Sequence, residues 1–231
     1  MVKPQTIKVA LTIATLLLLP TPSIAEDTAL RYTSDPTFSA LSRKGTPKDI
    51  TRGGGKRGCL DLARVSGEVL TAVIPQDGGG GLSATATPTF WVYVPYAVDN
   101  GTPLSAVLSL RQTDSFKSAP LQKVPITLPG KPGLVSLKLP VPIVNPGLLA
   151  WTLTVVCDAE NPARNPFVTG LVMIRANPNL LQRLGGLLRG EQVMEYARSG
   201  YWYDTLAMVM GTDDDLARQQ LMESVGLKAM R

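Results

Sequence analysis

Histidine is absent from this 231-residue chain, and cysteine occurs only twice. Without an imidazole the chain has no Ser-His-Asp or Cys-His mechanism, no histidine general base and no histidine-ligated zinc. No Ser-x-x-Lys motif occurs either. The acidic run from Asp213 to Asp215 lacks the spacing of a calcium loop and suits the start of a helix. We therefore predict a protein that is not an enzyme and that uses no cofactor and no metal.

Long apolar runs are also scarce, and the longest lies near the start of the chain. Two lysines accompany an uncharged apolar run from Val9 to Leu19, and Ser23-Ile24-Ala25 has the small-x-small pattern of a cleavage site. The run is too short to span a bilayer comfortably, and the prolines that follow it cannot prolong a helix. We predict that residues 1–25 are a signal peptide, and that the product is periplasmic or extracellular and soluble after cleavage.

Positive charge is concentrated in one segment of the chain. Without the two lysines of residues 1–25, the net charge falls from +5 to +3, and Asp49 is the only acid between residues 43 and 57. We predict that residues 26–58 form a basic, Gly-rich flexible arm with weak contact to an anionic membrane surface or polymer, the alternative being a solvated linker. The body is nearly neutral, so nucleic acid is not an expected partner. The basic residues are Arg43, Lys44, Lys48, Arg52, Lys56 and Arg57.

The two cysteines, Cys59 and Cys157, belong to a chain predicted to enter an oxidising compartment. A pair in that setting favours a disulfide over a metal site or a nucleophile, the alternative being two unpaired core thiols. Such a bridge would close a loop of about 100 residues and stabilise the fold by about 4–5 kcal/mol. In the predicted strand 148–157, Cys157 shares a face with Trp151 and Val155, so we expect the disulfide to be buried.

Short runs rich in Val, Ile, Leu and aromatic residues follow Cys59, with proline and glycine between them. No long helix intervenes, a pattern that indicates an antiparallel sandwich. We predict a mainly β fold, an immunoglobulin-like β-sandwich over residues 59–176. Pro125 places its strand at a sheet edge. The predicted strands are 69–74, 89–95, 105–112, 123–128, 134–139, 148–157 and 167–176.

Helical periodicity replaces this pattern after Ala176. Asn177-Pro178 has the form of an N-cap and a first-turn proline, and Gly200 suits the end of a helix. We predict a small C-terminal helical appendage over residues 177–231, packed on the sandwich. Its helices begin at Pro178, with Gly185-Gly186 ending or weakening the first, and then cover 191–199, 201–210 and 213–224.

Aromatic residues gather in two places that suggest a surface. Phe90 to Val94 is apolar on both strand faces, so one face should pack against the helical tail. Tyr196 to Leu206 resembles one turn-and-helix element of a tetratricopeptide repeat, but an array needs about three repeats, which favours docking on the sandwich over a peptide groove. A carbohydrate-stacking platform is the other alternative. The candidate interaction residues are Trp91, Tyr93, Tyr201, Trp202 and Tyr203.

Several blocks, in this order, resemble the exported, mainly cyanobacterial family called domain of unknown function 928. The blocks are Gly53–Cys59, Leu70–Pro75, Pro88–Tyr96, Val156–Asp158, Gly200–Leu206 and Ser224–Leu227. The resemblance covers nearly the whole chain after the signal, although Asp49-Ile50 departs from the Arg-, Gly- and Pro-rich pattern expected there. It implies that the two cysteines are a matched pair and that body and tail form one architecture. It implies no activity.

These observations lead to one functional hypothesis and two alternatives. The hypothesis is an exported, non-enzymatic interaction or structural module of the cell envelope, with another envelope protein as its partner. The first alternative is a carbohydrate-binding module that uses an aromatic platform. The second is a hydrolase that works without histidine.

Overall fold

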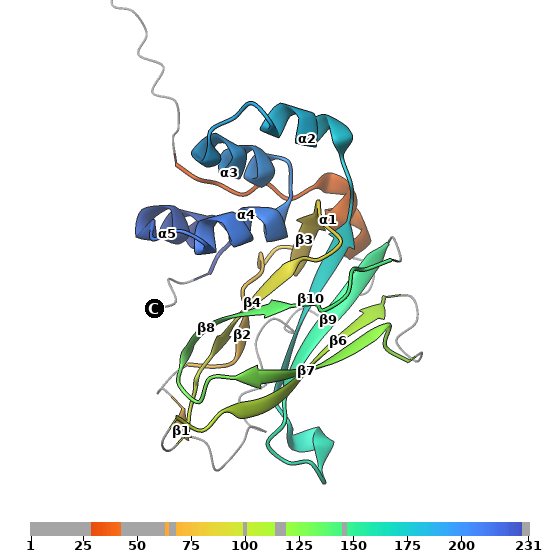
Figure 1. The fold of residues 1–231 in the computed structure, drawn as a ribbon, viewed down its shortest axis with the longest axis vertical. Helices are drawn as coiled ribbons and strands as arrows, with labels where there is room; N and C mark the ends of the chain where they lie inside the picture. Colours follow the sequence, from red (N-terminus) through yellow and green to blue (C-terminus); the bar gives the residue numbers. More distant parts are fainter. Residues whose placement is uncertain are drawn as a thin grey trace, which may run out of the picture.

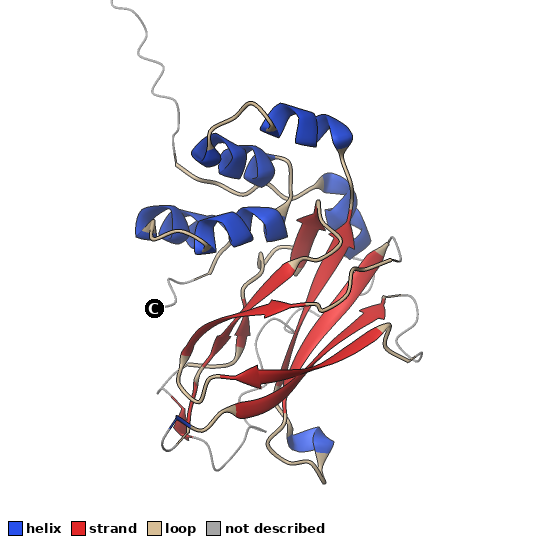
Figure 2. Ribbon diagram, viewed as in Figure 1, coloured by secondary structure: helices blue, strands red, loops and turns tan. Residues whose placement is uncertain are grey.

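The computed structural model describes residues 29–42, 63–64, 68–98, 101–113, 119–144 and 147–227. The predicted signal peptide, Cys59 and the six basic residues between 43 and 57 lie outside them. Within this part of the chain, no helix has both the length and the apolar character needed to cross a membrane. The fold is mainly β, with antiparallel and mixed sheets and several short helices (Figures 1 and 2).

The larger sheet has five strands in the spatial order β3, β10, β9, β6 and β7. Neighbouring strands are antiparallel except β3 and β10, which are parallel. Pro125 lies on the edge strand β7, as predicted, because an edge leaves one side of the strand without ladder hydrogen bonds. The bounds are Gly80–Ser83 (β3), Phe167–Ile174 (β10), Leu148–Val155 (β9), Leu104–Gln112 (β6) and Gln122–Leu128 (β7).

Strand β3 contradicts the prediction of a wholly antiparallel fold. The Gly78 to Gly81 run has the composition of a turn, yet Gly80 and Gly81 pair with Leu171 and Val172 of β10. A Cβ at Gly80 would overlap the main-chain carbonyl of Leu171, so only glycine allows this approach. An immunoglobulin-like strand order stays a prediction.

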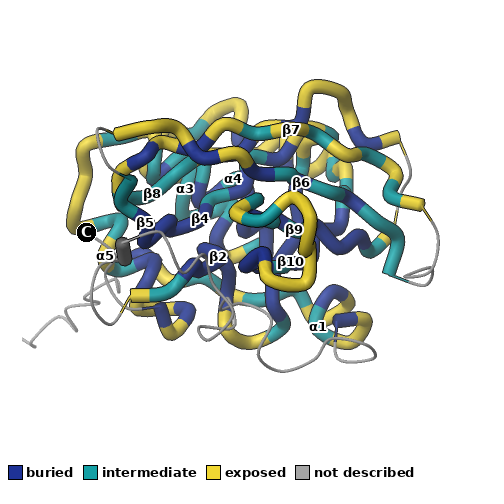
Figure 3. Tube along the Cα trace, turned by 90° about the horizontal axis from the view of Figure 1, so that it is seen from below, coloured by how far each residue is buried: buried dark blue, intermediate teal, exposed yellow. Residues whose placement is uncertain are grey.

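The smaller sheet has three antiparallel strands in the order β2, β4 and β8. Their bounds are Thr71–Ala72, Thr89–Val94 and Gly133–Lys138, and a short pair joins β1 (Ala63–Arg64) to β5 (Tyr96–Ala97). The two larger sheets share one hydrophobic core, in which Phe90 of β4 stacks on Trp151 of β9 with ring centroids 4.9 Å apart. Seen from below, buried residues gather along β2, β4, β9 and β10 (Figure 3).

Strand β9 confirms its predicted alternation and corrects the prediction for Cys157. Leu149, Trp151, Leu153 and Val155 are fully buried on one face. The strand ends at Val155, however, and Cys157 is exposed in the loop that follows. The prediction that Cys157 is buried is therefore wrong. Cys157 does not carry a free thiol. Its pairing with Cys59 stays a prediction, because Cys59 lies outside the described residues.

Four helices follow β10 and cover one end of the sheets, as predicted (Figure 2). The first begins as expected: Asn177 caps it by accepting a hydrogen bond from the N–H of Leu180 at 3.1 Å. Helix α4 packs against β3 and β4, so the helices share the core of the sheets. The bounds are Pro178–Leu184 (α2), Arg189–Arg198 (α3), Trp202–Met210 (α4) and Asp215–Ser224 (α5).

Residues 29–42 contradict the flexible-arm prediction, which covered residues 26–58. Ala29 to Asp35, here called the strap, runs between α3 and α5, and helix α1 (Pro36–Ser42) follows it beside β10 (Figure 1). Asp35 starts α1 by accepting a hydrogen bond from the N–H of Phe38 at 2.8 Å. The low average apolar content misled the prediction, because Leu30 and Phe38 each enter a core cluster.

Candidate functional site

The aromatic residues after α3 enter the sheet core. Gly200 has a positive φ of 79°, which ends α3 and turns Tyr201, Trp202 and Tyr203 toward the strands, where all three are buried. The indole N–H of Trp202 donates to the carbonyl of Val73 at 3.1 Å. These aromatics therefore attach the helices to the sheets.

Tyr203 forms a buried hydrogen-bonded pair with Trp151. The indole N–H of Trp151 donates to the Tyr203 hydroxyl at 2.8 Å, and that hydroxyl donates to the carbonyl of Leu171 at 2.7 Å. Burial raises the pKa of the Tyr203 phenol, which keeps the donor protonated. Phe90 completes the cluster with an edge-to-face contact to Tyr203 at 5.3 Å. Two polar groups are thus satisfied inside the core.

The predicted aromatic surface is not open to a ligand. Tyr93, Tyr201, Trp202 and Tyr203 are buried, and Trp91 is half-buried on β4. A sugar-stacking platform needs exposed ring faces, so these five residues do not build one. Docking on the strands was the favoured prediction for the Tyr201 to Tyr203 segment, and the hydrogen bonds to Val73 and Leu171 confirm it.

The strap lies extended on the helices and shows how they hold a polypeptide segment. Its main chain donates hydrogen bonds from Leu30 to the Gln220 side chain at 3.0 Å, and from Thr33 to the carbonyl of Ala197 at 3.0 Å. Side chains alternate: Leu30 is buried and Tyr32 half-buried, whereas Arg31 and Thr33 are exposed. Helices α3 and α5 thus bind an extended segment through its backbone and alternate side chains.

Tyr32 is the central anchor of the strap. Its main-chain N–H donates to the Ser224 hydroxyl at 3.2 Å, and its phenol donates to the carbonyl of Gly200 at 3.1 Å. Its ring contacts Trp202 edge-on, with centroids 5.1 Å apart. Because Trp202 is itself attached to the strands, the strap is coupled to the sheet core through one indole ring.

Asp35 ends the strap with a partly buried ion pair to Arg175, at 2.9 Å. Gly200 lies directly beneath it: a Cβ at Gly200 would stand 2.8 Å from the Asp35 Cβ and 2.9 Å from its main-chain nitrogen. Glycine at this position therefore serves two purposes. It permits the left-handed backbone at the end of α3, and it leaves room for the strap.

Replacing Gly200 with alanine should loosen the strap and destabilise the fold. The left-handed backbone alone costs an alanine about 1–2 kcal/mol, and the contact with Asp35 adds to that cost. Hydrogen exchange at residues 29–42 should rise in the variant, and the urea midpoint should fall. Gly190→Ala, at an open position of α3, is the matched control and should be neutral or stabilising. Equal behaviour of the two variants would contradict the packing described here.

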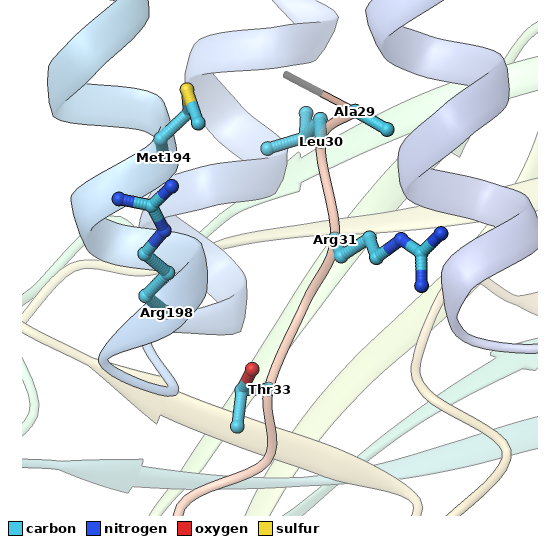
Figure 4. Close-up of a pocket in the computed structure, with 6 residues that line it drawn as sticks. All are labelled: Ala29, Leu30, Arg31, Thr33, Met194 and Arg198. Carbon is cyan, nitrogen blue, oxygen red and sulfur yellow. The ribbon is translucent and has the colours of Figure 1, made fainter. Parts of the chain in front are cut away.

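A groove continues beyond the strap on the same helices. A cleft of about 220 Å³ separates the strap from α3, and Figure 4 shows Met194 and Arg198 of α3 facing the strap across it. A larger hollow of about 480 Å³ lies between α3, α4 and α5, and the two hollows share Leu30 and Met194. The apolar residues that line the larger one are Leu30, Val193, Met194, Met208, Val209, Leu216 and Ala217.

Most of the polar groups at the rim have local partners. Arg189 donates to the carbonyl of Met208 at 3.3 Å near the end of α4, and Asp214 accepts from the N–H of Ala217 at 2.9 Å to cap α5. Leu216 remains 65% exposed on the rim, although it is a large apolar side chain. The groove therefore combines an apolar lining with a charged edge, a surface suited to a polypeptide segment.

Asp204 of α4, one of the helices that line the groove, has a carboxyl with a raised pKa. It lies in the first turn of α4 and accepts a hydrogen bond from the N–H of Ala84 at 2.9 Å. Burial raises the pKa of Asp204 to about 6, against the lowering effect of its hydrogen bonds to Ala84 and Ser83. The folded protein therefore binds a proton at this site more readily than the unfolded chain does.

The free energy of unfolding should fall as the pH rises from the ordinary pKa of an aspartate, 3.8, to the raised pKa of Asp204, about 6. The carboxyl is protonated in both states well below its ordinary pKa of 3.8, and between that value and about 6 the unfolded chain is ionised while the folded protein keeps the proton, which favours unfolding. Asp204→Asn keeps an acceptor for Ala84 but carries no charge. In urea titrations the stability of the variant relative to the wild type should be lowest at about pH 3 and should rise by pH 7. A constant difference between the two proteins across this range would show that Asp204 titrates normally.

The groove escaped the prediction because no single segment builds it. Its lining comes from the strap and from three helices, whereas the aromatic motif at Gly200–Leu206 pointed to the sheets. The one available signal for the groove was Leu216, a large apolar side chain that is not among the buried residues of α5, Leu221 and Met222. Among the described residues, no group of three or more Cys, Asp or Glu side chains is arranged to hold a metal ion.

Residues 52–231 match the family described as domain of unknown function 928, which confirms the resemblance predicted from the sequence blocks. The matched segment contains all three groove helices, whereas the strap precedes it. Comparisons with curated proteins and with solved structures found no match.

Proposed function

We propose that this chain, which belongs to the domain of unknown function 928 family, is an exported interaction module of the cell envelope that binds an extended segment of a partner protein. The binding surface is the groove between α3, α4 and α5. Export is supported by the signal-peptide pattern of residues 1–25. The description of the family assigns no activity, so the proposal is based on the geometry of the groove.

One observation carries the proposal: the same helices already bind an extended segment beside this groove. The main-chain N–H groups of Leu30 and Thr33 donate to Gln220 of α5 and Ala197 of α3, so the two helices recognise backbone as well as side chains. Leu30 and Met194 line both the cleft beside the strap and the larger hollow. A partner segment in this groove would meet apolar contacts of the same kind as those that hold Leu30.

The charged edge supports a polypeptide over a purely apolar ligand. Arg189, Asp214 and Gln220 line the hollow beside Val193 and Met208, so polar groups lie next to apolar ones. An extended segment presents alternating side chains and regularly spaced main-chain groups, which fits such a mixed lining. The partner we propose is therefore an extended segment with an apolar side chain at alternate positions.

Site-specific photo-crosslinking in intact cells tests this proposal. A photoreactive phenylalanine analogue at Leu216, on the groove, should crosslink to one recurring partner, within a single extended segment. The matched control places it at Leu181 of α2, which is 50% exposed and does not line the groove. A peptide of the captured segment should bind the purified protein and bind the Leu216→Asp variant at least about tenfold more weakly. Equal crosslinking at both positions, or equal affinity of the peptide for the wild type and for Leu216→Asp, would refute the proposed binding groove.

A further inference from the structure

Arg198 differs from the other described arginines that lie on helices α2 to α5 or next to them. It is the last residue of α3, it is exposed, and within the described part of the chain it makes no hydrogen bond or ion pair. Each of the others has a hydrogen-bond or ion-pair partner. Their partners are Asp35 for Arg175, Glu195 for Arg183, the carbonyl of Met208 for Arg189, and Asp215 for Arg218.

The cleft beside Arg198 has a composition that would receive an anion next to an apolar group. Its six lining residues include two arginines and no acid. Figure 4 shows the guanidinium of Arg198 on the side of α3 that faces the strap, close to Met194, whereas Arg31 extends to the other side of the strap. Leu30 and Met194 supply apolar surface beside the Arg198 fork, and the cleft opens into the larger hollow through these two residues.

We propose that this cleft is a carboxylate subsite, in which Arg198 pairs with an Asp or Glu side chain of the partner segment. The inference rests on the proposed function, and it adds the chemistry of the ligand. A guanidinium matches a carboxylate with two parallel N–H···O hydrogen bonds, a geometry that an ammonium does not reproduce. The preferred partner segment is therefore acidic, with an apolar residue close to its acid.

Two synthetic peptides and the purified protein test the subsite. The probes are acetyl-Leu-Ala-Glu-Ala-Leu-amide and the same peptide with glutamine in place of glutamate. NMR titration follows the Arg198 guanidinium N–H and the methyl groups of Met194, Met208 and Leu216. The glutamate peptide should bind about fivefold more tightly than the glutamine peptide. Arg198→Gln should abolish that preference, and Arg198→Lys should retain part of it.

The outcomes separate the subsite from the groove. If both peptides shift the groove methyl groups with equal affinity, the carboxylate subsite is wrong and the groove stands. If the glutamate preference survives Arg198→Gln, the carboxylate binds elsewhere and the assignment to Arg198 is wrong. If neither peptide shifts these methyl groups at millimolar concentration, the groove itself is contradicted. Raising the salt concentration should weaken the glutamate preference, because the pair is close to solvent.

Discussion

Replacing Trp202 with alanine should lower the free energy of unfolding by about 3–5 kcal/mol, the range for truncating a buried large aromatic residue. Trp202 is fully buried, its indole N–H donates to the carbonyl of Val73, and its ring contacts Tyr32. A Cβ at Gly81 would lie only 2.5 Å from the Trp202 Cβ, so β3 packs directly against this residue. Urea unfolding followed by circular dichroism measures the loss.

The same substitution should release the strap, because Tyr32 loses the ring that it packs against. Amide hydrogen exchange at residues 29–35 should increase by more than the fall in the global free energy of unfolding accounts for. Leu216→Ala, at an exposed position of α5, is the control and should change stability by less than about 0.5 kcal/mol. A loss below about 1 kcal/mol for Trp202→Ala would contradict the role of this residue in joining helices, strap and strands.

Replacing Cys157 with serine should cost about 2–5 kcal/mol, the usual effect of removing a native disulfide. Cys157 lies two residues after the end of β9, and its main-chain N–H donates to the Asn165 side chain at 2.9 Å, which holds it in the loop. A bridge to Cys59 would close a loop of about 100 residues and restrict the unfolded chain. The cysteine is exposed in the structure, so the expected effect comes from this restriction and not from a cavity.

Reduction supplies the control for the disulfide. A reductant should lower the urea midpoint of the wild type to that of Cys157→Ser and leave the variant unchanged. Alkylation of the native protein without reductant should label neither cysteine. Labelling of both thiols in protein purified from the envelope would show that the predicted bridge does not form there.

Local patterns predicted the elements that depend on neighbours in the sequence. The alternation of Leu149, Trp151, Leu153 and Val155 gave the buried face of β9, because a strand turns successive side chains to opposite faces. Asn177-Pro178 gave the start of α2 through its capping geometry. The aromatic segment after Gly200 was correctly expected to dock on the strands.

Contacts between distant segments were not predictable in this way. β3 begins with two glycines, of which Gly80 allows a close approach to β10 and Gly81 a close approach to Trp202, whereas glycine runs otherwise signal turns. The strap is mostly polar, and its order comes from partners about 190 residues away, such as Gln220 for Leu30. The groove depends on the second of these contacts, since Leu30 of the strap lines both hollows.

Binding of the strap sequence in trans tests most directly whether these helices recognise extended segments. A fluorescent peptide of residues 26–35 is titrated with the wild-type protein and with a Leu30→Ala/Tyr32→Ala variant, whose own strap has lost both anchors. The peptide should bind the variant, with an affinity lost when its leucine and tyrosine become aspartate. The wild type should bind at least about tenfold more weakly, because its own strap competes at high effective concentration. No binding to a folded variant, or equal binding of the aspartate peptide, would contradict extended-segment recognition by this surface.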